Sequence, residues 1–333
     1  MGSPQRHPRK REDSCGPGLV AATIASYLDV LRTSVAATRG TFAVLHEDGR
    51  VVVHPTGRAS CTFTVDVAEL EPGCHIAVSP RGAHVVITRR SGMIECWDVA
   101  RQRRLWLGRP SRAFASPTTT EPLTLGAPMF LDDTTFATHH EGGIVLWYVA
   151  SHEPLAAVTS VGNVRASYPF GPDRLLAVPE LAGAAPFVVD TKRATILGRW
   201  PAVRDGVVGV AVAQGVVVVA EPHRVRVQRG DQHVWLSSDG RITAVAVDHR
   251  GVAWATHDAI EIQSLSGYNA RRVDTSALAC IALSLDGDHV RALGEDGRVH
   301  ALHLDDGVAC PVRLDRLGAR KASEDAGARP ESP

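Results

Sequence analysis

The sequence predicts an all-β fold built from repeated units, and three observations lead to this prediction. Short apolar runs alternate with turn residues over most of the 333-residue chain, as expected for short strands. These runs group into units of about 40 residues. The hydrophobic fraction is 44% and the aromatic fraction only 5%, so the core depends on aliphatic residues, among which valine favours strands.

Turn sequences mark the repeat. The letters EDGRV occur at 47–51 and again at 295–299, and EGGI at 141–144 occupies the same place in its own unit. Asp-Gly suits a tight turn between two antiparallel strands. Each unit has four apolar runs separated by such turns, so each unit predicts one four-stranded antiparallel sheet.

The number of units predicts how the sheets assemble. A single sheet of this size cannot bury its faces, whereas sheets stacked around an axis bury both faces and leave only short edges. We therefore predict one seven-bladed β-propeller over 33–314, with six or eight blades as the alternatives. The seven units are 33–67, 74–107, 128–160, 164–200, 207–238, 242–275 and 280–314.

The unit at 74–107 carries the marks of a known family. Its first strand ends in Ser-Pro-Arg-Gly at 79–82, and its third strand ends in Trp97-Asp98. The unit resembles a blade of the WD-repeat (WD40) family, which implies a propeller and a non-catalytic scaffold or adaptor for protein–protein interaction. Only one Trp-Asp occurs, and the Gly-His of the family is missing, so most of its Asp–His–Ser/Thr–Trp hydrogen-bond set is absent. We therefore expect apolar stacking alone to hold the blades.

The segments outside the repeat are expected to be simpler. Residues 1–13 are polar, basic and proline-bearing, and residues 315–333 lack an apolar period, so both predict disordered tails. Between the first tail and the propeller, residues 14–32 place apolar side chains at helical spacing and predict one short amphipathic helix. The last unit is expected to supply its own fourth strand over 309–314, in place of the family's closure by an N-terminal strand.

The predicted helix resembles part of a second family. The segment LVAATIASYLD at 19–29 is similar to the first half of an F-box, a three-helix module. This resemblance implies an alternative function, an F-box/WD-type substrate receptor of a ubiquitin ligase; the other interpretation is a helix that caps the propeller. The adaptor-binding residues implied by the resemblance are Leu19, Val20, Ile24, Tyr27 and Leu28.

Charge and cysteine content restrict the function class. Lys+Arg and Asp+Glu both number 36, which argues against a protein that wraps nucleic acid. The six cysteines form no C-x-x-C pair, which favours a reducing compartment. No apolar run reaches about 18 residues and no signal peptide is visible, so we expect an intracellular protein without membrane contact.

No local motif indicates catalysis. The chain lacks G-x-S-x-G, H-E-x-x-H, P-loop and G-x-G-x-x-G sequences. Because neighbouring strand residues face opposite ways, His139 and His140 do not predict a metal site. His257-Asp258 is interpreted as a turn. We predict no catalytic residue, metal or cofactor. The less favoured alternative is a propeller enzyme with a channel site, which small apolar inner strands disfavour.

The turns between second and third strands form the candidate site. In a propeller these turns share one rim, and six of the seven carry an acid. Either the acids suit tight turns, or they form an acidic rim that binds a protein with a basic surface. The chain itself is predicted to be monomeric. The acids are Glu47, Asp48, Glu141, Glu180, Glu221, Asp258, Glu295 and Asp296, and the seventh turn carries Arg89 and Arg90.

Overall fold

The protein is described here from a computed structural model. The described residues are 21–23, 34–38, 41–66, 74–89, 91–109, 127–140, 142–159, 161–171, 173–181, 184–201, 203, 206–266, 270–275, 280–286, 289–294, 299–303 and 308–310. Within these ranges the regular elements are β-strands, and no helix is long and apolar enough to cross a membrane.

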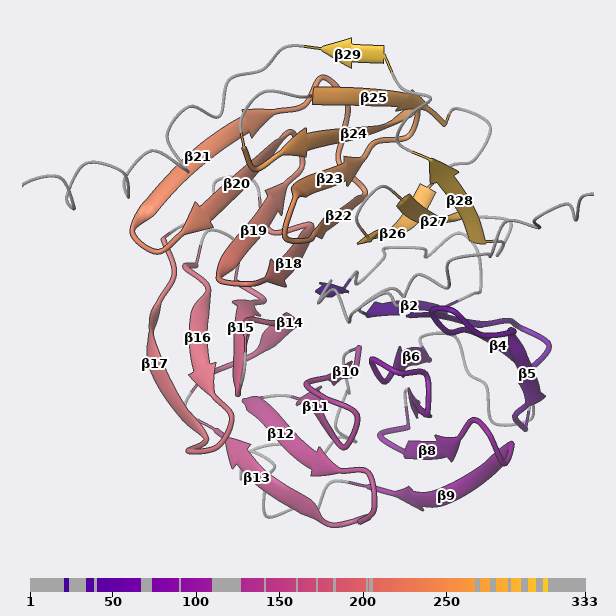
Figure 1. Ribbon diagram of the computed structural model, residues 1–333. Helices are drawn as coiled ribbons and strands as arrows, with labels where there is room; N and C mark the ends of the chain where they lie inside the picture. Colours follow the sequence, from indigo (N-terminus) through magenta and orange to yellow (C-terminus); the bar gives the residue numbers. More distant parts are fainter. Residues whose placement is uncertain are drawn as a thin grey trace, which may run out of the picture.

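Seven antiparallel sheets stand around a common axis, which confirms the predicted propeller (Figure 1). Blade 1 contains β2 (Ser34–Thr38), β3 (Thr41–Leu45), β4 (Arg50–His54) and β5 (Cys61–Thr64). Blade 2 contains β6 (His75–Val78), β7 (His84–Thr88), β8 (Ile94–Asp98) and β9 (Arg103–Gly108). Blade 3 contains β10 (Met129–Phe130), β11 (Thr135–His140), β12 (Gly143–Tyr148) and β13 (Pro154–Val158).

The remaining blades repeat this order from the inside outwards. Blade 4 contains β14 (Val164–Pro169), β15 (Arg174–Pro179), β16 (Phe187–Asp190) and β17 (Thr195–Arg199). Blade 5 contains β18 (Gly209–Ala213), β19 (Val216–Glu221), β20 (Arg224–Arg229) and β21 (Gln232–Ser237). Blade 6 contains β22 (Ala244–Val247), β23 (Gly251–Ala255), β24 (Ala259–Ser264) and β25 (Ala270–Asp274). Blade 7 contains β26 (Cys280–Asp286), β27 (His289–Gly294) and β28 (Val299–His303).

The hydrophobic core lies between the blades. Strand side chains point alternately to the two faces of a sheet, so one strand serves two interfaces. In β7, Val85 and Ile87 pack with blade 1, whereas Val86 packs with blade 3. Complete burial of such an aliphatic side chain contributes about 1.5–3 kcal/mol. The blades are therefore stable only as neighbours of one another.

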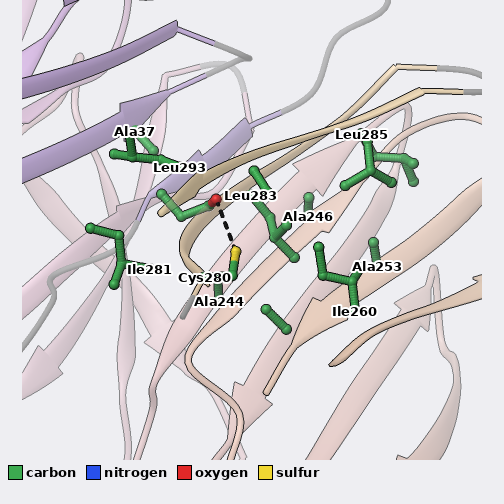
Figure 2. Close-up of a cluster of buried hydrophobic side chains, with 14 of the residues drawn as sticks. Ala37, Ala244, Ala246, Ala253, Ile260, Cys280, Ile281, Leu283, Leu285 and Leu293 are labelled. Atoms are coloured by element: carbon green, nitrogen blue, oxygen red, sulfur yellow. Dashed lines mark hydrogen bonds between the residues drawn. The ribbon is translucent and has the colours of Figure 1, made fainter. Parts of the chain in front are cut away.

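The ring closes by packing between blade 7 and blade 1. Ala37 and Phe42 of blade 1 share one apolar cluster with Leu283 and Leu293 of blade 7, and this cluster continues into blade 6 (Figure 2). The Arg291 guanidinium also lies 5.5 Å from the centre of the Phe42 ring. The four strands of blade 1 all come from residues 34–64, so its sheet has no strand in common with blade 7.

The prediction that the last unit supplies its own fourth strand over 309–314 is wrong for Ala309 and Cys310, the part of that segment that the structure describes. Strand β29 (Val308–Cys310) pairs with the outer edge of β25, in the register Ala270 to Cys310. It therefore extends blade 6 to five strands, while blade 7 has three in the described part of the chain. The edge of β25 offers the same row of backbone donors and acceptors as an edge of blade 7, so local sequence does not decide between the two.

The predicted helix over 14–32 is wrong where the structure describes it. Ala21–Thr23 form strand β1, which pairs antiparallel with the inner edge of β18. The short indigo strand lies near the centre of the ring, beside the inner strands (Figure 1). The inner edge of β18 supplies hydrogen-bond partners to the extended segment Ala21–Thr23. This tertiary pairing outweighs the weak preference for a helix that the spacing of apolar residues indicates.

Hydrogen bonds from side chains also join the blades, so the expectation of apolar stacking alone is wrong. Trp106 Nε1 of blade 2 donates to the carbonyl oxygen of Val149 in blade 3 at 2.7 Å. Thr41 Oγ1 donates to Pro80 O at 2.8 Å between blades 1 and 2, and Thr243 Oγ1 donates to Cys280 O at 2.9 Å between blades 6 and 7. Each such bond contributes about 0.5–1.5 kcal/mol.

Removal of residues 1–32 tests this mode of closure. We expect the truncated chain to keep its β-type circular dichroism and one cooperative urea transition, because blade 1 is built from later residues. The loss of the β1–β18 pairing should lower the free energy of unfolding by about 1–3 kcal/mol, equivalent to two or three backbone hydrogen bonds. An unfolded truncated chain would show instead that the N-terminal segment closes the ring.

Candidate protein-binding rim

The predicted acidic rim consists of the turns between the second and third strands of the blades. Glu47 and Asp48 lie in the β3–β4 turn, Glu180 follows β15, and Asp258 lies between β23 and β24. All four are exposed. Because each blade is an antiparallel meander that starts at the inner strand, these turns come together on one rim of the propeller.

Local contacts hold the exposed acids in place. The Arg50 backbone N–H donates to Asp48 Oδ1 at 3.0 Å, and Gly49 has a φ of 79°, the left-handed conformation that favours glycine in such a turn. Asn163 Nδ2 donates to Glu180 Oε2 at 3.0 Å. Asp258 pairs with His257 at 2.9 Å. The Arg50 Nε also lies 3.7 Å from Asp48 Oδ2. These contacts fix the turns while the four acidic residues stay exposed.

Two of the predicted rim residues are not on the surface. The Glu221 side chain is 0% exposed and forms an ion pair with Arg224, whose Nη2 lies 2.6 Å from Oε2. The Arg89 side chain is 2% exposed and pairs with the equally buried Glu95, which also accepts a hydrogen bond from Trp97 Nε1 at 2.9 Å. The prediction that Glu221 and Arg89 line a binding rim is therefore wrong. Both side chains belong to the interior of their blades.

Other predicted residues lie outside the described part of the chain. For the rim these are Glu141, Arg90, Glu295 and Asp296, and for the adaptor-binding helix they are Leu19, Val20, Ile24, Tyr27 and Leu28. Both sets stay predictions.

Sequence reasoning missed a buried polar contact between blades 3 and 4. His139 Nε2 and Ser167 Oγ are hydrogen-bonded at 2.6 Å, and both side chains are buried. Burial, together with the nearby His75 and His140, lowers the pKa of His139 from 6.5 to about 3. Among the described residues Nδ1 of His139 has no partner, so no carboxylate orients this ring as in a Ser–His–Asp site. The contact joins two blades through a neutral imidazole.

This contact predicts a pH dependence of stability. The pKa of His139 is lower in the folded chain than in the unfolded chain, so the unfolded state binds more protons below about pH 6.5. The free energy of unfolding therefore falls as the pH drops. Between pH 7 and pH 5, His139 should lower the free energy of unfolding by about 2 kcal/mol. In urea unfolding, the difference in this free energy between pH 7 and pH 5 should therefore be about 2 kcal/mol smaller for His139→Gln than for the wild type.

An exposed histidine provides the control for this measurement. His233→Asn removes an exposed imidazole from β21. This variant should show the same difference in the free energy of unfolding between pH 7 and pH 5 as the wild type. Equal losses of stability in the wild type and in His139→Gln would contradict the assignment.

The described residues give no sign of a metal centre. They contain no group of three or more His, Cys, Asp or Glu side chains placed to hold a metal ion. His139 and His140 occupy adjacent positions opposite Ile144 and Gly143 of β12, so they project to opposite faces of the sheet, as the sequence predicts. On the inner strands β18 and β22, Ala211 and Ala244 are fully buried in the apolar clusters between blades.

Comparisons with known proteins show the fold alone. No protein-family model matches the chain, and no curated protein matches its sequence. A chain in the crystal structure of the mitotic checkpoint complex is 13% identical, with a TM-score of 0.58, and the match covers 91% of this chain and 96% of that one.

Two further solved structures are similar. The computationally designed Ika8 protein is 16% identical, with a TM-score of 0.55, over 87% of this chain and 98% of that chain. BamB from Moraxella catarrhalis is 16% identical, with a TM-score of 0.51, over 81% of this chain and 82% of that chain. These identities are low, so the likeness supports the propeller architecture and carries no activity over to this chain.

Proposed function

We propose that the protein is a non-catalytic, intracellular interaction scaffold of the WD-repeat type, which binds a basic protein surface along its acidic rim. The observation that carries the proposal is the exposure of Glu47, Asp48, Glu180 and Asp258 on one rim. Like charges gathered on one side of a surface accelerate the encounter with a partner of opposite charge and help to select it. The propeller fold, which this chain shares with a chain of the mitotic checkpoint complex, is compatible with such a scaffold.

The cysteines support the intracellular part of this proposal. Cys96 and Cys280 are buried thiols without disulfide bonds, and burial raises the pKa of each to about 12. A thiol with such a pKa stays protonated near pH 7 and reacts slowly. Both side chains therefore serve as small apolar residues of the core.

Neutralisation of the exposed acids tests the proposal. The rim variant Glu47→Gln/Asp48→Asn/Asp258→Asn removes three charges with little change in shape, and the side-chain amide introduced at position 48 can still accept the Arg50 N–H. Affinity capture from a cell lysate followed by mass spectrometry should recover the principal partner at least about tenfold less well, because its association slows and its charge pairing is lost.

A matched variant controls for net charge. Asp173→Asn/Glu153→Gln/Asp231→Asn removes three exposed acids from turns at the opposite rim, between first and second or between third and fourth strands. This variant should recover the partner as the wild type does. Equal recovery by the wild type and the rim variant would contradict a binding role for the acidic rim.

Two alternatives stay predictions. A ubiquitin-ligase receptor requires a helical adaptor-binding segment, and the described part of that segment, Ala21–Thr23, is a strand in the channel. A propeller enzyme requires titratable side chains that converge on the channel, and the described inner strands consist mainly of small apolar residues buried between the blades.

A further inference from the structure

The outer half of blade 5 carries a row of basic side chains on the face directed at blade 4. Val225 and Val227 of β20 point towards blade 6 and belong to its apolar cluster. By alternation Arg224 and Arg226 point the other way. Arg226 lies opposite Val219 of β19, which packs in the cluster between blades 4 and 5. At the outer end of the interface between blades 4 and 5, two arginines thus occupy positions that aliphatic residues fill further in.

The guanidinium of Arg226 lies close to two indole rings. Its Cζ lies 5.3 Å from the centre of the Trp200 ring and 5.8 Å from that of Trp235. Trp200 is fixed in turn by an edge-to-face contact with Phe170 at 5.0 Å. Cation–π attraction favours such contacts, more strongly where water is excluded. We call Arg226, Trp200 and Trp235 the arginine clamp.

The two arginines differ in charge compensation. Arg224 binds Glu221 through Nε at 2.7 Å and Nη2 at 2.6 Å, and its Cζ stacks 4.2 Å from the centre of the Trp235 ring. Arg226 makes no hydrogen bond or ion pair within the described part of the chain. Its Nε is buried without a partner, whereas its terminal nitrogens are not among the buried atoms and so reach solvent.

The surroundings of the clamp favour an acceptor of hydrogen bonds. Trp200 Nε1 is a second buried donor that lacks a partner. Glu221 Oε1 and Gln228 Oε1 are buried acceptors without a partner, but Glu221 is already bound by Arg224 and forms no ion pair with Arg226. Burial lowers the pKa of Arg226 and the charge of Glu221 opposes this shift only in part, so an approaching anion would further stabilise the cation.

The chemistry of the clamp identifies its ligand. A planar guanidinium forms two parallel hydrogen bonds with a carboxylate, and a guanidinium already in contact with aromatic rings loses little conformational freedom on binding. Trp235, which is 38% exposed, offers an apolar surface for a residue next to the carboxylate. We propose that the arginine clamp binds the Asp or Glu side chain of an acidic segment in a partner protein.

This inference is separate from the acidic rim in charge and in the residues that are tested. The clamp lies in the outer half of blades 4 and 5, close to the β19–β20 turn, whereas Glu47, Asp48 and Asp258 lie in turns of blades 1 and 6. A protein ligand is favoured over nucleic acid, because the clamp has a single cation that forms no ion pair and the chain has no net charge.

Selection of peptides on the full-length chain tests the clamp. A phage library of random dodecapeptides should yield sequences with a shared Asp or Glu beside an apolar residue. In fluorescence anisotropy, replacement of that acid by Asn or Gln should weaken binding at least about tenfold, the loss expected for a charge-assisted bidentate pair.

Variants of the protein complete the test. Arg226→Gln and Arg226→Lys should each weaken peptide binding at least about tenfold, because lysine keeps the charge but lacks the planar fork. The matched control is Arg229→Gln, an exposed arginine of the same strand on the opposite face, which should bind within about twofold of the wild type. The rim variant should bind the peptide with the affinity of the wild type. The experiment can therefore reject the proposal for the clamp without rejecting the proposal for the acidic rim.

Three outcomes would overturn the assignment. Selected peptides without a common acid would exclude a carboxylate ligand. Unchanged affinity in both Arg226 variants would exclude the clamp. Tighter binding of a fluorescein-labelled 20-base single-stranded oligonucleotide than of the peptide, lost in Arg226→Gln, would assign the clamp to nucleic acid instead.

Discussion

The structure depends on the burial of each blade against its two neighbours. In β19, Val218 and Ala220 face blade 6 and Val219 faces blade 4, so neither face of the sheet can be left in water without a large loss of apolar burial. The same constraint holds between blades 7 and 1, where Phe42 and Leu293 share a cluster. The ring therefore closes because an open end would expose the face of a blade.

Periodicity revealed most of this architecture from the sequence alone. Alternating apolar runs and Asp-Gly turns report which residues form strands. Six predicted units coincide with blades 1 to 6, and the seventh supplies the three described strands of blade 7. The strands β1 and β29 could not be predicted in the same way. Each has three residues, and each pairs with an edge that exists only after the ring has assembled. Tertiary pairing of this kind leaves no local signal.

The site was only partly predictable, for a related reason. The turn positions of Glu47, Asp48 and Asp258 follow from the repeat, and so does their exposure. The burial of Glu221 depends on Arg224, which comes three residues later across a turn, and the burial of Arg89 depends on Glu95 on the next strand. The stacking of Arg226 on Trp200 joins two blades, so only the fold brings them together. The two proposed surfaces thus combine exposed acids at one rim with a single cation in the outer half of blade 5, near that rim.

Amide hydrogen exchange at several urea concentrations tests the central claim of mutual support between blades most directly. If no blade is stable without its neighbours, the slowest amides of the inner and second strands in all seven blades should exchange through one global opening. These amides should then share one free energy of opening and one dependence of that free energy on urea. A blade or a group of blades that opens separately, at a lower free energy and with a smaller urea dependence, would contradict the account.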